Sequence, residues 1–189
     1  MSFTHTKKEH TGITMADIEQ SANRVLEIAQ LRKQEICDED NGITDMQSFV
    51  VFERGDIYEC RQSGVDGHPF ESLPSVLESA FKDGLTKFDT VSIVVDSYVR
   101  EGTKPPTDYR RGDLEHEYKS NPSTSVVEAL TVCTYGYDGG VKARCTKYVY
   151  GDDGRPQFTA IDDKDSQMSS EYVDFVMSKY IQWCKESSQ

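Results

Sequence analysis

The chain has 189 residues, of which 36% are hydrophobic and 29% are charged, and its formal net charge is −12 at pH 7. This composition is typical of a folded globular protein, and the acidic charge argues against direct binding to nucleic acid or to anionic lipid. The sequence contains no run of about 18 apolar residues and no apolar leader, so we expect a cytoplasmic protein without a membrane segment.

The first predicted element is an amphipathic helix over about residues 14–37. Thr14 and Asp17 match the Ser/Thr-x-x-acid pattern of a helix start. Apolar residues then recur at helical spacing, at Ile18, Ala22, Val25, Leu26, Ala29 and Ile36. The acidic residues 38–40 and the Asn-Gly pair behind them end the helix. Residues 1–12 are polar, and we expect them to be flexible.

Two short strands are predicted next, over residues 48–52 and 57–61, joined by a turn at residues 53–56. Gly55 provides the positive φ that such a turn needs. The tripeptide Arg54-Gly55-Asp56 also matches an integrin-binding motif, but a chain without an export signal favours the reading as turn chemistry.

A second helix is predicted from Phe70 to Gly84, with Pro74 in its first turn. Residues 90–99 are rich in β-branched side chains and predict a central strand. Within that strand the alternation of Val91, Ile93 and Val95 predicts one face that packs against the helix carrying Leu77 and Phe81.

Residues 100–123 form an unusually long connection, which in compact domains is commonly functional or disordered. A short helix from Asp113 to Lys119 is expected inside it, and Pro122 prevents its continuation. We expect the connection to be the most mobile ordered part of the domain.

The stretch from Val126 to Tyr150 predicts a β-hairpin at the centre of the sheet. With a three-residue loop at 138–140, Tyr135 pairs with Ala143 and Cys133 with Cys145, whereas a two-residue loop would place Cys133 opposite Arg144. The three-residue form is preferred because it gathers apolar side chains on one face.

A short strand over residues 157–161 and a solvated linker over 162–165 follow the hairpin. The chain then ends in a helix that begins at about Ser169. Its predicted buried face consists of Tyr172, Phe175, Val176, Tyr180 and Trp183.

This order of elements predicts one α+β domain over residues 1–189, with a mainly antiparallel sheet and helices packed on it. The five cysteines, Cys37, Cys60, Cys133, Cys145 and Cys184, include no C-x-x-C pair, so buried free thiols are expected rather than disulfides or a zinc site. No cofactor or metal is predicted.

The candidate binding residues lie in or beside the long connection. They are Arg100, Lys104, Tyr109, Arg110 and Arg111. Arginines with aromatic neighbours suit a phosphate, a carboxylate or an acidic protein surface. The alternative is a solvated loop whose cations pair with the nearby acids Asp108, Asp113, Glu115 and Glu117.

Catalytic candidates are Asp96, at the end of the central strand, and His116, between Glu115 and Glu117. His116 lacks the second histidine of an H-E-x-x-H site, and no serine or cysteine has a nucleophile-elbow context. His68, in a glycine-rich loop before a proline, is interpreted as a loop residue.

Four segments carry a resemblance to a known group of proteins: Asp96-Ser97-Tyr98, residues 109–114, residues 126–130 and residues 148–156. With them, the stretch from about 90 to 160 resembles small uncharacterised proteins of actinobacteria and their bacteriophages. The resemblance implies a phage accessory protein, and it implies no activity and no functional residue.

The first hypothesis is therefore a non-enzymatic interaction protein that binds or masks a host or viral protein, with a DNA mimic as one variant. The alternatives are a binder of a small phosphorylated ligand through residues 100–123, and a small hydrolase that uses Asp96 or His116.

Overall fold

A computed structural model describes residues 12–39, 46–62, 69–100, 113–121, 124–161 and 171–188. Six antiparallel strands form one sheet in the order β2-β1-β3-β4-β5-β6. The strands are β1 (Phe49–Arg54), β2 (Ile57–Gln62), β3 (Thr90–Arg100), β4 (Val126–Gly136), β5 (Val141–Tyr150) and β6 (Pro156–Ala160). The predicted α+β class with a mainly antiparallel sheet is confirmed.

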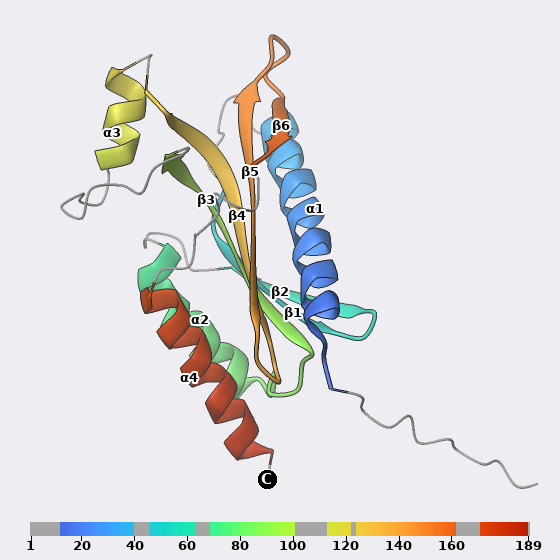
Figure 1. Cartoon of the computed structure of the whole chain (residues 1–189). Coiled ribbons are helices and arrows are strands. Elements are labelled where there is room, and N and C mark those ends of the chain that lie inside the picture. Colours follow the sequence, from blue (N-terminus) through green and yellow to red (C-terminus); the bar gives the residue numbers. More distant parts are fainter. Residues whose placement is uncertain are drawn as a thin grey trace, which may run out of the picture.

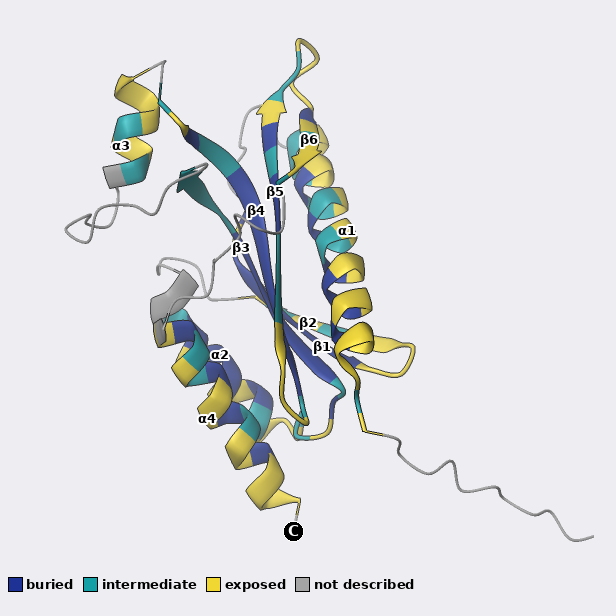
Figure 2. Cartoon of the chain, viewed as in Figure 1, coloured by how far each residue is buried: buried dark blue, intermediate teal, exposed yellow. Residues whose placement is uncertain are grey.

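The helices cover both faces of this sheet (Figure 1). One face carries α1 (Met15–Glu39), and the other carries α2 (Pro69–Lys82) and α4 (Glu171–Ser187), while α3 (Asp113–Ser120) lies at the far end of β3 and β4. The sheet is therefore covered on both sides along its centre (Figure 2), which explains why β3 and β4 are buried at successive positions rather than at every second one.

The start of α1 agrees with the sequence pattern. The Thr14 N–H donates to Asp17 Oδ2 at 2.9 Å, and the Asp17 N–H donates to Thr14 Oγ1 at 3.3 Å. This reciprocal cap satisfies backbone donors that the first turn leaves without partners, and its hydrogen bonds lower the pKa of the exposed Asp17 carboxyl. The cap thus sets where α1 begins.

The position predicted for Pro74 is wrong, because α2 already begins at Pro69. A proline is favoured in the first turn, where no intrahelical partner is lost, and Pro69 occupies that place. Pro74 stands in the second turn, where its missing N–H leaves the carbonyl of Phe70 without its usual donor.

The predicted packing of β3 is confirmed. Val91, Ile93 and Val95 belong to one buried cluster that contains Leu77 and is flanked by Phe81. Val94, on the opposite face, packs instead in the cluster beneath α1. The alternation along β3 thus divides its side chains between two cores.

We expect Ile93→Ala to lower the free energy of unfolding by about 2 to 5 kcal/mol, because the side chain is 2% exposed and its removal leaves a cavity. Denaturant titration measures this loss, and Val149→Ala, at an exposed position of β5, is the matched control. A loss at Ile93 as small as that of the control would contradict the assigned core.

The predicted register of the β4–β5 hairpin is wrong by two residues. Tyr135 pairs with Val141 and Cys133 with Ala143, so Cys145 lies opposite Thr131 instead of Cys133. A three-residue loop is present, but it consists of residues 137–139, and the Gly136 N–H donates to the Gly140 carbonyl at 3.1 Å.

Two neighbours explain this shift. The Tyr137 N–H donates to the Asp89 carbonyl at 2.9 Å, so Tyr137 continues the ladder with β3 and is lost to the hairpin pairing. A Cβ atom at Gly136 would lie 2.6 Å from the side chain of Ile18, so α1 requires a glycine there. Because the slip is an even number of residues, each side chain stays on its predicted face, although Val141 and Val149 are exposed.

The face predicted to be buried on α4 is also largely wrong. Val173, Met177, Tyr180 and Cys184 are the buried residues. Of the predicted set, Tyr180 is one of them, and Val176 is partly buried against the same core. Apolar residues recur at helical spacing along two sides of this helix. The side with the smaller residues, from Val173 to Cys184, packs against the sheet, and the more aromatic side does not. Tyr172, Phe175 and Trp183 remain exposed (Figure 2 shows the exposed side of α4).

All five cysteines are free thiols, as predicted, but not all are buried. Cys60 is exposed on β2 and Cys37 is half-buried on α1. Burial, assisted by Asp174 and Cys145, raises the pKa of Cys133 to about 12, so this thiol stays protonated at neutral pH.

Candidate functional site

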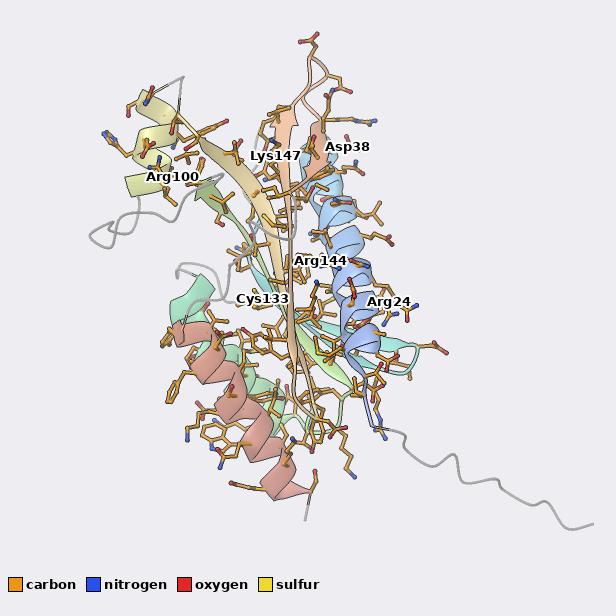
Figure 3. The ribbon with its side chains drawn as sticks, viewed as in Figure 1. Arg24, Asp38, Arg100, Cys133, Arg144 and Lys147 are labelled. Carbon is orange, nitrogen blue, oxygen red and sulfur yellow. The ribbon has the colours of Figure 1, made fainter. Side chains whose placement is uncertain are left out.

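Arg100 is the one predicted binding residue that the structure describes, and it lies at the end of β3 beside α3 (Figure 3). Its guanidinium forms an ion pair with Glu117 of α3 and donates from Nη1 to Ser125 Oγ at 3.4 Å. The side chain is largely buried. Arg100 therefore takes part in the ion pairing that was the alternative to anion binding, and Lys104, Tyr109, Arg110 and Arg111 lie outside the described residues.

The helix α3 is attached to the sheet through more than this ion pair. The rings of Tyr98 and Tyr118 are in contact, with centroids 5.1 Å apart, and the Tyr118 hydroxyl donates to Glu128 at 3.4 Å. Thr124 also donates its hydroxyl to Glu117. The expected short helix is confirmed, and these contacts give it a defined place beside β3 and β4.

Asp96 lies in a buried polar cluster between α1 and the sheet. Its carboxylate accepts from Lys33 Nζ at 2.5 Å, from the Tyr148 hydroxyl at 2.6 Å and from the Met46 N–H at 3.2 Å. Lys33 is 1% exposed, and its ammonium group also lies 4.6 Å from the centre of the Tyr148 ring. Three donors thus surround the Asp96 carboxylate, and α1 covers it.

The charges of this cluster support one another. Burial disfavours the ammonium form of Lys33, but the Asp96 carboxylate and the Tyr150 hydroxyl together outweigh that effect and raise the pKa of Lys33 above its ordinary value. Burial and the same carboxylate raise the pKa of the Tyr148 hydroxyl, which remains protonated and donates. The cluster therefore holds one ion pair in place and offers no exposed group to a substrate.

A second polar cluster lies near the start of α1, around Glu53 at the end of β1. Its carboxylate accepts from the hydroxyls of Ser21 and Thr90, the latter at 2.9 Å, and pairs with Arg24 at 3.2 Å. On the same side of the sheet, Arg144 of β5 donates to Asn23 of α1 at 2.8 Å (Figure 3). Such hydrogen bonds fix the position of α1 along the sheet.

The two catalytic candidates are not brought together. His116 is exposed on α3, where its neighbour Glu115 pairs with Lys119, and Asp96 is enclosed beneath α1. In the part of the chain that the structure describes, no group of three His, Cys, Asp or Glu side chains is placed to hold a metal ion.

A pocket of about 390 Å³ opens at the end of the sheet near the β4–β5 loop. Arg54 and Lys87 line it, but so do Asp89 and Asp138. Asp89 already accepts the Gly55 N–H at 2.7 Å. Balanced charges of this kind select neither an anion nor a cation, so the pocket does not identify a ligand class.

The most unusual exposed feature is a row of side chains along α4, here called the α4 stripe: Tyr172, Phe175, Lys179 and Trp183. The three aromatic residues keep 47%, 61% and 50% of their surface exposed. Their spacing of three, four and four residues places them on one side of the helix, next to the buried face. Large exposed aromatic side chains in a row are uncommon on a surface that has no partner.

Two contacts hold the α4 stripe in shape. The Trp183 ring meets Phe81 of α2 edge to face, with centroids 6.2 Å apart, and Lys179 Nζ lies 5.9 Å from the centre of the Phe175 ring. Beneath the stripe, Val173, Met177 and Tyr180 anchor α4 to the sheet. The stripe is thus presented on a fixed support.

Sequence reasoning singled out these aromatic residues but assigned them to the core. One signal pointed to the alternative, since Val173, Met177, Tyr180 and Cys184 also recur at helical spacing. A helix with two apolar stripes can bury only one of them against a single sheet. Lys33 carried a similar signal, because it stands four residues after Ala29 in the apolar repeat of α1 and so requires a buried acidic partner.

Searches of protein-family models, curated proteins and solved structures found no match to the chain. None of the helices in the described residues is both long and apolar enough to span a membrane.

Proposed function

We propose that this protein is a non-enzymatic interaction module that binds another protein through the α4 stripe. The observation that carries the proposal is the exposure of Tyr172, Phe175 and Trp183 on a helix whose other side is fully packed. Tyrosine, tryptophan and phenylalanine are enriched at the centres of protein interfaces, where they supply most of the binding energy.

The rigidity of α4 favours binding. Its buried side is anchored in the core, and Trp183 already rests against Phe81. The backbone of α4 and the ring of Trp183 are thus already in place when a partner docks, so less entropy is lost on association. A preformed aromatic row on a fixed helix suits a partner with an apolar groove, in the manner of helix-in-groove recognition.

The net charge of the chain also favours one class of partner. The net charge of −12 attracts a basic partner over the distance that salt screening allows, and this attraction raises the association rate. The favoured partner is therefore a protein with an apolar groove inside a basic surface. The resemblance of residues 90–160 to phage proteins supports a small accessory protein acting on a host or viral protein as part of the same proposal.

Photo-crosslinking tests this directly. A photoreactive amino acid placed at position 175 of the full chain is expected to capture one main partner in a lysate of cells that express the protein. Leu31 is the matched control position, because it is 60% exposed on α1, on the other side of the sheet. Capture of the same partner from position 31 with equal yield would contradict the proposal.

The affinity of variants for the captured protein then measures how much the α4 stripe contributes to binding. Replacing Phe175 and Trp183 by alanine is expected to weaken binding by about 30-fold or more, the effect of losing at least one interface hot spot. Leu31→Ala should leave the affinity unchanged, and both variants should retain the far-ultraviolet circular dichroism of the parent. Unchanged affinity of the double variant would exclude the α4 stripe as the binding surface.

A further inference from the structure

We infer that β2 pairs with β2 of a second copy of this chain, so that two sheets join into one across a twofold axis at Cys60. β2 is the last strand at its end of the sheet, and no other strand in the described residues pairs with its outer side. The other end is closed differently, since β6 is short, begins with Pro156 and is packed against α1.

The backbone of β2 has donors and acceptors that point outward. The Glu53 carbonyl accepts from the Asp89 N–H at 2.7 Å, so the peptide groups of Glu53 face β3 and those of its neighbours face β2. In the register of the hairpin, Ile57, Glu59 and Arg61 therefore bond to β1. Tyr58, Cys60 and Gln62 present their N–H and C=O groups to the outside.

A second copy of β2 matches this pattern in an antiparallel arrangement. With Cys60 opposite Cys60 of the second copy, Tyr58 lies opposite Gln62, and all outward groups meet one another. About six hydrogen bonds result, two for each directly bonded pair. Side chains keep their faces, because a twofold axis perpendicular to the sheet leaves both faces unchanged.

Charge selects this register among its neighbours. Centring the pairing on Glu59 would place two carboxylates opposite each other, and centring it on Arg61 would place two guanidinium groups opposite each other. Centring it on Cys60 sets Glu59 against Arg61 of the second copy, twice, in the close non-bonded positions of the ladder. Within one copy, Arg61 already contacts Glu59 at 2.6 Å and Asp83 at 3.0 Å, so its guanidinium lies on the face where the partner's carboxylate would arrive.

The exposed ring of Tyr58 fits the same arrangement. Tyr58 is 59% exposed at the edge of the sheet. In the proposed pairing Tyr58 covers Gln62 of the second copy. The occupant is thus a second copy of this chain, whose strand supplies both the matching hydrogen bonds and the opposite charges.

Sedimentation equilibrium of the full chain over a concentration series, under reducing conditions, tests the inference. We expect a concentration-dependent rise from 21.4 kDa toward twice that mass. Glu59→Arg and Arg61→Glu should each weaken self-association by roughly tenfold or more, since each variant sets like charges opposite each other. An equimolar mixture of the two should associate again, because every facing pair in the mixed dimer has opposite charge.

Several outcomes would overturn the inference. They are a parent chain that stays at 21.4 kDa at every concentration, single variants that associate as strongly as the parent, and a mixture that stays monomeric while both variants keep their folded circular dichroism.

A further readout is independent of charge. Mild oxidation should link two copies through Cys60, since facing Cα atoms lie about 5.5 Å apart in a bonded pair, and Cys60→Ser should abolish the link while Cys37→Ser should not. The α4 stripe is not involved, so these results stand apart from those of the crosslinking experiment.

Discussion

Replacing Asp96 by alanine is expected to lower the free energy of unfolding by about 3 to 5 kcal/mol. The change removes the acceptor of Lys33, of the Tyr148 hydroxyl and of the Met46 N–H, and it leaves the Lys33 ammonium buried without its counter-charge. A buried charge that has lost its partner is among the most destabilising defects in a protein interior.

A double-mutant cycle separates the ion pair from its surroundings. Lys33→Met removes the charge but keeps the packing of the stem, and Asp96→Asn keeps an acceptor for Tyr148. We expect the double variant to regain a large part of the stability that Asp96→Asn alone loses, because no unpaired charge remains. Denaturant titration of the four proteins measures the coupling. Additive losses would show that Lys33 and Asp96 do not act as a pair.

The same pair predicts a response to alkaline pH. The pKa of Lys33 is raised in the folded state above the ordinary value of 10.5, so the folded chain holds this proton more tightly than the unfolded chain. The stability that the pair contributes is fully present below pH 10.5 and is lost as the pH rises through the folded value. Tyrosines also titrate in this range, so the quantity to compare is the stability difference between the parent and Lys33→Met. That difference should shrink above pH 10.5.

Tyr180→Ala is expected to lower the free energy of unfolding by about 3 to 5 kcal/mol, whereas Trp183→Ala, three residues further along α4, should lower it by only about 1 to 2 kcal/mol. Tyr180 is 2% exposed, stacks on Phe88 with centroids 5.9 Å apart, and donates its hydroxyl to the Leu85 carbonyl at 2.6 Å. Trp183 is 50% exposed, and within the described residues its ring contacts Phe81 edge to face, with centroids 6.2 Å apart.

The contrast between these two variants is a sharp test of which side of α4 faces the sheet. Truncating the larger side chain should have the smaller effect, because half of the Trp183 surface stays in water in the folded chain, whereas Tyr180 is almost fully buried. Thermal or denaturant unfolding of both variants gives the comparison. A Trp183→Ala variant that is as unstable as Tyr180→Ala would show that Trp183 is a core residue, and it would contradict the description of the α4 stripe as an exposed surface.

The candidate surfaces differ in how far they could be foreseen. The residues of the α4 stripe were recognised from helical spacing, but their exposure was not, because periodicity shows that a stripe exists and not which of two stripes the sheet covers. Arg100 was recognised as a cation with aromatic neighbours, while its pairing with Glu117 depends on the position of α3 beside β3. The outer edge of β2 has no partner strand in the described residues because β2 is the last strand of the sheet. The order of strands in a sheet cannot be predicted from the hydrophobic pattern of each strand.

Local chemistry in the sequence by itself determined the elements and their class. The cap formed by Thr14 and Asp17, the turn at Gly55 and the β-branched run from Thr90 to Val95 act over a few residues, so their effect does not depend on the rest of the chain. Tertiary structure alone decided the register of the hairpin, because the Asp89 carbonyl accepts the Tyr137 N–H and Ile18 packs directly against Gly136. It alone also paired Lys33 with Asp96, which are 63 positions apart in the chain. These contacts join residues far apart in the chain, and they exist only once the sheet and its helices have come together.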